Sequence, residues 1–372
     1  MIEYRKAKSN EREKLIDLAN FAFDQDIGSL LPKVYNQEFD LSSLHKVAVD
    51  DQGSIRAQVA VLPETLRVCD STLRVGFVGI VSVHPGARGE GHMKELMNLW
   101  LHEISDTCDI AVLWGQRQRY EYFGFTVGGM QYKYIIGDAN VRHALKDVDA
   151  EGLSFSPLFD LEGGQGFAHR VHSKQLAYVE RDIQQLPLIF SSFQQNALGI
   201  LDKDRLIGYM IVNGTGDEVS ELMMEVTSDI ERTVKAYMKH MGIDRITIRT
   251  SDYDTALNPS LGKFAEEYVI EPAHMYNIFD FANVLKAYLT LKHQTIGLEP
   301  GEFSAILDGQ PVTICVDPKG VTVDRSATPG AVILNKEQAQ TLLLTPHGRF
   351  LNVSAPAGWF PLPLYWSKVD LF

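Results

Sequence analysis

Paired cysteines are missing from this sequence. Its 372 residues include 3 cysteines, Cys69, Cys108 and Cys315, and each stands alone in the chain. Isolated cysteines provide neither the CxxC pair of a zinc site nor the even-numbered set of a disulfide framework. Their scarcity therefore excludes a disulfide-stabilised secreted module, favours a reducing cytoplasm and predicts no metal cofactor.

Long apolar runs are missing as well. No stretch approaches the roughly 18 consecutive apolar residues that a membrane-spanning helix needs. The first residues, Met1 to Arg5, become charged at once, so no signal peptide is expected. These absences predict a cytoplasmic protein without a membrane span.

Positive charge is scarce relative to negative charge. Lysine and arginine number 35 against 48 aspartates and glutamates, which gives a formal net charge of -13. A chain this acidic repels phosphate backbones, and no basic patch offsets the repulsion, so no nucleic-acid partner is expected. The excess suits a cationic small molecule or a basic protein segment, although it serves solubility equally well.

What the sequence does contain is the composition of a folded protein. Apolar residues make up 45% and charged residues 22%, and this length predicts two or three domains. In residues 1–150 strands alternate with helices, which predicts a mostly antiparallel sheet with flanking helices. The expected strands span 2–7, 45–49, 54–62, 66–68, 73–83, 109–114 and 132–136.

The rest of the chain predicts two further domains, and the whole is an α+β protein. Residues 151–273 repeat the hairpin–strand–helix–strand order of the first domain. In this second copy Val226-Thr227-Ser228-Asp229 joins strand to helix, where the first copy has a glycine-rich loop. Residues 274–372 predict a helix near 279–291, several short strands and an apolar, aromatic end.

The glycine-rich loop of the first copy is Arg88-Gly89-Glu90-Gly91. Small residues let backbone N–H groups approach a ligand, and N–H groups at the start of a helix attract anions. No Gly-Lys-Ser/Thr follows, so this is not a Walker loop, and His92-Met93-Lys94 breaks the GxGxxG dinucleotide fingerprint. Taken alone, the loop is better explained as a turn without a ligand.

A second motif changes this interpretation. Val81 to Gly91 resembles the acetyl-CoA-binding motif of the GNAT N-acetyltransferases, Arg/Gln-x-x-Gly-x-Gly/Ala, with Met93 as a departure at its last position. Tyr120-Glu121-Tyr122-Phe123-Gly124-Phe125 resembles the Tyr-x-x-x-Gly-Phe segment of the same proteins, at the expected distance downstream. Two motifs in the correct order indicate a GNAT domain.

The order of domains is similar to one branch of these enzymes. A GNAT domain (1–150), a degenerate GNAT-like domain (151–273) and a sterol-carrier-like α+β domain (274–372) resemble the enhanced intracellular survival (Eis) family. In that family the position of Met93 departs from the pattern as well. The resemblance covers the whole chain, is motif-specific in its first third, and implies a homo-oligomer, with a hexamer as the assembly that the family suggests.

The resemblance also implies which residues contact acetyl-CoA as the co-substrate. Val81 and Val83 would reach the acetyl-pantetheine arm through their backbones, although their side chains also fit an ordinary core strand. The loop would cradle the pyrophosphate, although Arg88 also fits a solvated surface position. The implied contact residues are Val81, Ser82, Val83, Arg88, Gly89, Glu90, Gly91, His92, Met93, Lys94, Gly115 and Gln116.

Two residues are implied to be catalytic. Tyr120 matches the general acid of the family, because a phenol near the sulfur can protonate a departing thiolate, whereas Tyr122 has the wrong spacing for the motif. The terminal carboxylate of Phe372 matches the general base. A simply buried terminus is the alternative for Phe372, and His84 is the other candidate base, although it is more simply explained as a loop residue.

These assignments predict an acetyl-CoA-dependent N-acetyltransferase that transfers acetyl directly to a primary amine. No cysteine lies near the motifs to carry an acyl-enzyme. The expected acceptor is an aminoglycoside, another cationic polyamine or a lysine, and Asp24 and Asp26 would hold its positive charge unless they are simply solvated. The alternative is a lipid or acyl carrier with a vestigial acetyltransferase domain.

Overall fold

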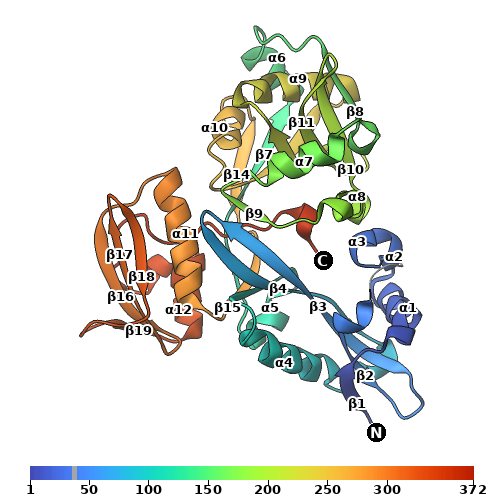
Figure 1. Ribbon diagram of the computed structural model, residues 1–372, viewed down its shortest axis with the longest axis vertical. Helices are drawn as coiled ribbons and strands as arrows, with labels where there is room; N and C mark the ends of the chain where they lie inside the picture. The colour runs from blue at the N-terminus through green and yellow to red at the C-terminus, as the bar shows by residue number, and fades with distance from the viewer. Residues whose placement is uncertain (36–39) are drawn as a thin grey trace. The chain divides into compact units, whose positions relative to one another are not determined.

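The computed structural model describes residues 1–35 and 40–372. These residues form two compact units (Figure 1). Unit 1 contains Met1–Gly129, His274–Leu362 and Phe372, and unit 2 contains Met130–Ala273 and Pro363–Leu371. Within the described residues no helix is long and apolar enough to cross a membrane.

The first sheet of unit 1 has the strand order β1-β2-β3-β4-β5-β15-β6. Pairing is antiparallel from β1 to β4, parallel between β4 and β5, and antiparallel from β5 through β15 to β6. The strands are β1 (Glu3–Lys6), β2 (His45–Val49), β3 (Ile55–Val68), β4 (Ser71–Val83), β5 (Ile110–Leu113), β6 (Thr126–Gly128) and β15 (His274–Ile278). The pairing of β3 with β4 continues through Pro63, opposite Gly76, so the strands expected at 54–62 and 66–68 are one strand.

Helix α4 (His92–Ser105) follows β4 and packs against β3. It forms because Leu96, Trp100 and Ile104 recur on one face at helical spacing, and that face is buried in a cluster with the sheet. The Trp100 indole donates a hydrogen bond to the Val59 carbonyl at 2.8 Å. Helix α1 (Arg12–Phe23) packs on β3 and β4, and the short helices are α2 (Ile27–Leu30), α3 (Pro32–Tyr35) and α5 (Arg117–Tyr120).

A smaller sheet completes unit 1. Its four strands run in the order β18-β17-β16-β19, with β19 parallel to β16. They are β16 (Gly301–Leu307), β17 (Gln310–Asp317), β18 (Gly320–Asp324) and β19 (Val332–Leu334), and the helices beside them are α11 (Phe281–Thr295) and α12 (Lys336–Leu344). The expected helix near 279–291 is confirmed as α11, which runs four residues further, and the expected short strands are confirmed as β16, β17 and β18, whereas β19 and α12 were not foreseen.

Unit 2 contains a sheet with the strand order β14-β7-β13-β12-β11-β10-β8. The strands are β7 (Gln131–Gly137), β8 (Leu153–Pro157), β10 (Asn196–Asp202), β11 (Arg205–Val212), β12 (Glu218–Met224), β13 (Arg245–Ser251) and β14 (Glu267–Glu271). The unit also contains β9 (Ala177–Val179), α6 (Asp138–Ala144), α7 (Gly164–His172), α8 (Leu186–Ser191), α9 (Ile230–Met241) and α10 (Leu257–Leu261). The expected hairpin–strand–helix–strand order is confirmed as β10 to β13.

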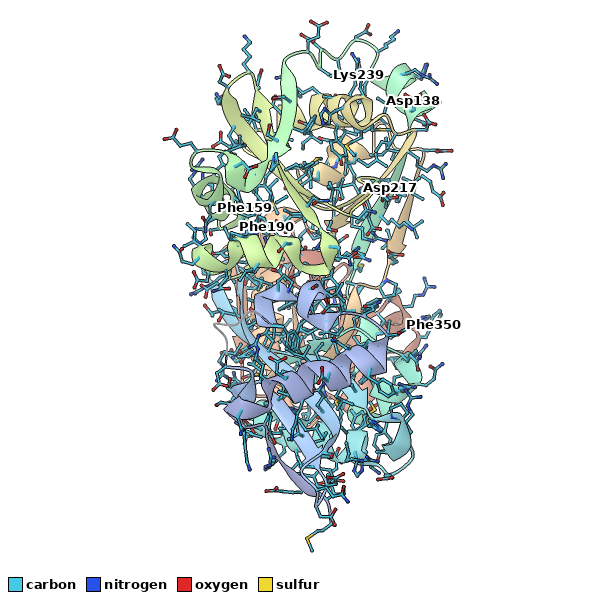
Figure 2. All side chains as sticks on the ribbon, turned by 90° about the vertical axis from the view of Figure 1, so that its right-hand side faces the viewer. Asp138, Phe159, Phe190, Asp217, Lys239 and Phe350 are labelled. Carbon is cyan, nitrogen blue, oxygen red and sulfur yellow. The ribbon has the colours of Figure 1, made fainter. Side chains whose placement is uncertain are left out.

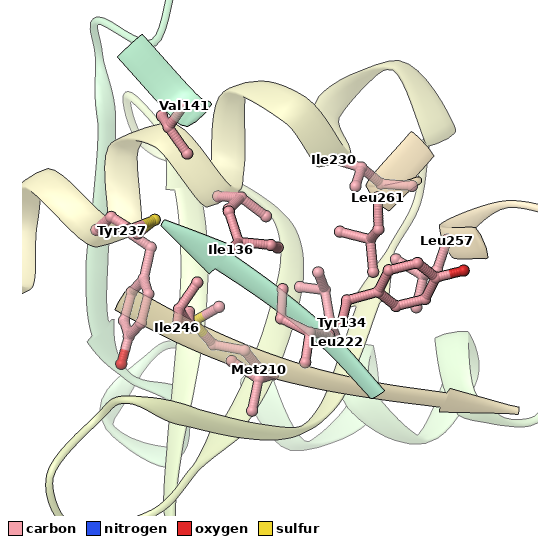
Figure 3. Packing of buried hydrophobic residues seen from close by; sticks show 14 of the residues in the cluster. Tyr134, Ile136, Val141, Met210, Leu222, Ile230, Tyr237, Ile246, Leu257 and Leu261 are labelled. Carbon is pink, nitrogen blue, oxygen red and sulfur yellow. The ribbon is translucent and has the colours of Figure 1, made fainter. Parts of the chain in front are cut away.

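Two apolar clusters hold unit 2 together. In the first, Tyr134 and Ile136 on β7 project among Met210, Ile246 and Tyr237 (Figure 3). The second lies with α7 and α8, where the rings of Phe159 and Phe190 are 5.8 Å apart (Figure 2). Phe190 stacks on Tyr209 of β11 at 5.6 Å.

The two large sheets exchange one strand each. Strand β7 follows β6 in the chain, yet it pairs with β13 and β14 in unit 2. Strand β15 follows β14, yet it pairs with β5 and β6 in unit 1. Each exchanged strand takes the same place in its sheet. The strand expected at 132–136 therefore belongs to the second sheet, while the division of the chain at 150 and 273 stays a prediction.

Candidate active site

The last part of β4 contains a bulge in its pairing with β3. Gln58 of β3 pairs with Ser82, but Ala60 pairs with Gly79, so β4 carries an extra residue between these pairs. Ile80 in this bulge has a φ of 48°, a left-handed conformation that is rare for a β-branched residue. The parallel pairing of β4 with β5 ends at Val78 and Leu113. Strand β5 itself ends at Leu113, whereas β4 continues past the bulge to Val83 without pairing with β5, and bulges are common beside active sites.

The strand residues after the bulge keep their side chains in the protein core. Ser82 is buried, and its hydroxyl donates to the Ile80 carbonyl at 3.2 Å. Val81 and Val83 are half-buried and pack against the α4 cluster. A ligand in the opening between β4 and β5 would therefore meet the backbone of Val81, Ser82 and Val83, which is the kind of contact that the resemblance implies.

The loop after β4 depends on its glycines for conformation. Gly89 and Gly91 have φ values of 87° and 85°, a region that L side chains avoid. At neither position would a Cβ meet an atom within 4 Å. The glycines are therefore needed for the backbone path, and the space beside them is open to a ligand.

Helix α4 starts directly after this loop with exposed donors. No side chain caps it, and its first backbone bond runs from the Glu95 N–H to the Gly91 carbonyl at 3.2 Å. The amides of His92, Met93 and Lys94 are consequently left without intrahelical acceptors at the positive end of a 14-residue helix. A helix start of this kind favours a negatively charged ligand.

Some side chains at the loop hold its conformation, and one adds positive charge. The buried His92 ring joins the Glu90 carboxylate at 2.9 Å and the Tyr4 hydroxyl at 2.8 Å. Glu90 is thereby drawn toward His92. Arg88 is exposed, so it can meet a phosphate from solvent.

Lys94, the third residue of α4, adds a second cation to the start of this helix. The Lys94 ammonium lies 4.8 Å from the centre of the Tyr122 ring. Met93, where the motif departs from Gly/Ala, is half-buried against the α4 cluster. Its side chain therefore packs inward, and its backbone amide remains part of the helix start.

His84 shapes the turn that leads into the loop. Its Nδ1 accepts the Gly86 N–H at 3.1 Å, and its ring stacks on Phe21 at 5.6 Å. The Arg56 guanidinium donates to the Gly86 carbonyl at 3.1 Å. These contacts give His84 a structural role in the turn, in agreement with its interpretation as a loop residue.

Tyr120 is a buried phenol at the end of α5, and its ring lies near Gly115, two residues after β5. Its side chain is 8% exposed, its ring meets Phe125 edge-on at 6.5 Å, and a Cβ at Gly115 would collide with it. Burial raises the pKa of the Tyr120 phenol, against an opposing effect of the Arg119 cation. Tyr120 thus keeps its proton at neutral pH, as a general acid requires. Tyr122, in contrast, is 65% exposed.

Gly115 and Gln116 lie in the connection between β5 and α5. Gln116 is exposed, and its carbonyl accepts the Arg119 N–H at 3.0 Å. The absence of a Cβ at Gly115 lets the Tyr120 ring approach the end of β5. The predicted role of both in binding cofactor stays a prediction.

Phe372, the predicted base, lies at the bulge of β4. The residue is 9% exposed, and its ring meets Phe77 of β4 edge-on at 6.3 Å. A Cβ at Gly79 would stand 2.7 Å from the Phe372 carbonyl oxygen. Gly79 follows Val78, the last residue of β4 that pairs with β5. The Phe372 carbonyl therefore lies beside the last residue of β4 that pairs with β5.

Asp24 and Asp26 follow α1 and are exposed. Asp24 ends that helix in a left-handed conformation, with its N–H donated to the Asn20 carbonyl. Asp26 accepts the Ser29 hydroxyl at 2.6 Å and the Ser29 N–H at 3.3 Å, and the hydroxyl bond is the main cause that lowers the Asp26 pKa. Asp26 therefore caps α2 locally, and the binding role of the two carboxylates stays a prediction.

Sequence reasoning missed Gly79 and the bulge beside it. A glycine inside a strand marks a bulge or a close approach of another chain segment, and Gly79 marks both. The described residues also contain no group of three or more His, Cys, Asp or Glu side chains placed to hold a metal ion.

The family comparison falls on the part of the chain that carries this site. A family model described as an acetyltransferase (GNAT) domain matches residues 3–128. No curated protein sequence matches the chain.

Solved structures share the fold at low identity. One is the GCN5-related N-acetyltransferase from Anabaena variabilis, with 18% identity, a TM-score of 0.71 and 100% of each chain covered. The GCN5-related N-acetyltransferase from Kribbella flavida has 15% identity and a TM-score of 0.68, with 100% of this chain and 98% of that chain covered. Eis1 from Mycobacterium abscessus has 13% identity and a TM-score of 0.60, with 90% and 87% covered.

Likeness at these identities shows the fold, and the domain match adds the enzyme class. The mixed α+β architecture carries GNAT-like sheets and helices and is similar to Eis1. Residues 3–128 are a GNAT acetyltransferase domain, and the protein is an enzyme of the N-acetyltransferase type.

Proposed function

We propose that the protein transfers an acetyl group from acetyl-CoA directly to a primary amine. The observation that carries this proposal is the opening of β4 from β5 beside the uncapped start of α4. The amides of His92, Met93 and Lys94 and the cations of Arg88 and Lys94 fit a pyrophosphate. The backbone beyond the bulge fits a pantetheine arm, and GNAT domains generally use acetyl-CoA.

The reaction needs a base, an oxyanion donor and an acid. The acceptor arrives as an ammonium ion and loses a proton to the Phe372 carboxylate. The free amine then attacks the thioester carbonyl, and the oxyanion that forms is stabilised by backbone N–H groups of β4 in the opening. When the C–S bond breaks, the departing thiolate takes the proton of Tyr120, and the second proton that the amine nitrogen loses restores the Tyr120 phenol.

The proposed acceptor is a cationic polyamine, such as an aminoglycoside, or a lysine side chain. The net charge of -13 and the exposed carboxylates of Asp24 and Asp26 near the end of α1 support this choice. Phe21, on the last turn of α1, stacks on His84 directly after β4. The acidic segment after α1 is thus tied to the strand that carries the bulge.

We further propose that residues 274–372 derive from a sterol-carrier-like domain. The four-stranded sheet with α11 and α12 supports this origin. A carrier function is less well supported, because the interior beside α11 is filled by its own side chains. The buried residues of α11 are Phe281, Ala282, Val284, Leu285, Ala287, Tyr288, Leu289, Leu291 and Lys292.

The test is an assay of CoA thiol release with acetyl-CoA and a panel of polyamines, aminoglycosides, lysine peptides and lipids. We expect release with at least one amine, together with a product heavier by one acetyl group in mass spectrometry. Lipid binding without thiol release from any amine would instead establish the carrier alternative.

A further inference from the structure

A cleft of about 450 Å³ lies in unit 2, and the described residues that line it all belong to that unit. They come from β8, β10, β11, α8 and the C-terminal end of α9. A volume of this size is within the range of small-molecule sites. The cleft lies at the end of α9, whereas the glycine loop of the first copy lies at the start of α4, so the cleft is not the counterpart of the proposed acetyl-CoA site.

Two phenyl rings line the cleft. The ring centres of Phe159 and Phe190 are 5.8 Å apart (Figure 2). Phe190 is buried, stacks on Tyr209 at 5.6 Å and lies 5.3 Å from the Arg181 guanidinium, so its ring is held in place. Phe159 is half-buried and can present part of its ring to a ligand. This aromatic wall suits another flat ring.

The end of α9 adds an adaptable apolar side chain and a partial negative charge. Met241, the last residue of this 12-residue helix, is 38% exposed and lines the cleft. It lies against Gly216, where a Cβ would be 2.5 Å from the Met241 methyl group. Methionine side chains adapt their shape to a ligand. The last carbonyls of a helix are its negative end, which favours a cation.

The backbone beside the cleft is strained. Phe193 and Gln194 have φ values of 58° and 55°, a left-handed conformation that is rare for residues other than glycine. The Ser192 hydroxyl donates to the Leu188 carbonyl at 2.9 Å, and the Gln195 side chain donates to the Ser192 carbonyl at 3.0 Å. Strained residues of this kind cluster at ligand sites.

Gln195 supplies an acceptor that lacks a donor. The residue lines the cleft and is 4% exposed, and its Oε1 atom has no hydrogen-bond partner among the described residues. A buried acceptor without a donor costs stability, which an N–H group of a ligand would restore. The exposed carboxylate of Asp160 also lines the cleft, and no lysine or arginine is among the described residues that line it. The cleft therefore favours a cationic donor over an anion.

We propose that this cleft binds a small aromatic amine, a ligand with an apolar ring and a primary ammonium group. The ring packs with Phe159 and Phe190, and the ammonium group donates to Gln195 and balances the charges of Asp160 and the end of α9. No residue of the cleft belongs to the candidate active site. The binding of this amine is therefore independent of the acetyl transfer proposed above.

The test is a calorimetric titration of the full chain, without acetyl-CoA, with 2-phenylethylamine as the probe. Gly214→Phe adds a phenyl group at an exposed residue of the cleft, where a Cβ would meet only the Gln194 carbonyl, at 3.9 Å. The backbone can therefore stay in place. Gly166→Phe is the matched control, because Gly166 is exposed on α7, a Cβ there would meet nothing within 4 Å, and it does not line the cleft.

We expect Gly214→Phe to remove this binding and Gly166→Phe to leave its Kd unchanged. Gln195→Met should weaken binding by about tenfold, because the ammonium group loses an acceptor. Asp160→Asn should weaken it only about twofold, since exposed charge pairs contribute little. Phenylacetate, which has the same ring and the opposite charge, should bind at least about tenfold more weakly than the amine.

Hydrogen exchange locates the bound amine without any assay of turnover. Saturating 2-phenylethylamine should slow exchange in residues 192–198 and 213–216 and leave α4 unchanged. An absence of binding, unaltered exchange in both segments, or equal affinity for phenylacetate would overturn the proposal. If Gly214→Phe does not fold, an unchanged Kd in Gln195→Met overturns it. Thiol release from acetyl-CoA should be the same in Gly214→Phe and the unaltered protein, so a failure of the proposed acetyl transfer would leave the binding result intact.

Discussion

The two large sheets share a strand order and open at the same place, yet the openings contain different things. In the first, β4 and β5 separate beside a glycine loop and a helix without a cap. In the second, β12 and β13 separate beside Glu221, which is buried and paired with Arg181. The difference teaches that two sheets of the same strand order can carry very different side chains at the same place, so the adjoining residues and not the sheet determine what that place can bind.

The helix starts differ in the same sense. Asp229 precedes α9, and Arg232 of its first turn bonds to Asp229 at 3.4 Å and to Asp202 at 3.0 Å. A carboxylate at the start of a helix satisfies the positive end that would otherwise attract a phosphate. A negative charge therefore lies at the start of α9, where the first copy has Gly91, although no side chain caps the N–H groups of either helix.

The largest expected effect is a loss of kcat when Tyr120, in the site of the first sheet, is replaced. Tyr120→Phe keeps the buried ring and removes the proton, so kcat should fall by roughly 10²–10⁴ while the Kd of acetyl-CoA holds. Tyr122→Phe is the matched control, because Tyr122 is 65% exposed and should be nearly silent. Steady-state rates of thiol release measure both, and equal losses in the two variants would remove Tyr120 from its role.

The next effect concerns the carboxyl group at Gly79. Deleting Phe372, or extending the chain beyond it, moves the carboxylate and should lower kcat by about a hundredfold or more. Phe372→Leu keeps a carboxylate and an apolar side chain, so it should retain far more activity. Acetyl-CoA should bind all these variants, as titration calorimetry can show. Undiminished kcat after extension would exclude Phe372 and direct attention to His84 or a water molecule.

A smaller effect separates the two helix starts. Gly91 and Gly163 precede α4 and α7 with nearly the same backbone, at φ, ψ of 85°, 4° and 72°, 4°. A side chain in this conformation costs about 1–2 kcal/mol, so Gly91→Ala should weaken acetyl-CoA binding by roughly tenfold. Gly163→Ala should lower stability similarly and leave the Kd unchanged.

Calorimetry of the same variants tests how many sites the chain has. We expect one acetyl-CoA per chain, because only the first copy carries the loop. At a hundredfold excess over Kd the ligand should stabilise the protein by about 2.7 kcal/mol. Two sites, or an affinity loss in Gly163→Ala, would show that the second copy binds cofactor after all.

Local patterns predicted much of the fold and the first part of the site. The periodicity around Trp100 predicted α4, and the glycines at 89 and 91 predicted the loop. Both signals lie within a few residues, so a single sequence suffices to find them.

The unforeseen features depend on distant contacts. Arg181 meets Glu221 across 40 residues and Asp370 across 189, and nothing near any of them in sequence indicates the partner. The exchange of β7 and β15 between the sheets could not be predicted either. The hydrophobic pattern of a strand indicates which of its faces is buried but not which sheet it joins.

The smallest effect at neutral pH is expected for Glu221 in the second sheet, because its contribution to the free energy of unfolding changes only in acid. Burial alone would raise the pKa of Glu221, but the Arg181 cation and its hydrogen bonds outweigh it and lower that pKa from 4.5 to about 2. Because the folded-state pKa is the lower one, the stabilisation is complete above pH 4.5 and is lost as pH falls toward 2. The free energy of unfolding should therefore show no contribution from Glu221 to its slope between pH 7 and 5. Below pH 4.5 the slope should be steeper in the unaltered protein than in Glu221→Gln. Glu225→Gln is the control, because Glu225 also pairs with an arginine of unit 2, through Arg170 at 3.1 Å. Urea unfolding at a series of pH values measures this, and identical acid slopes in all three proteins would mean that Arg181 does not hold Glu221 ionised.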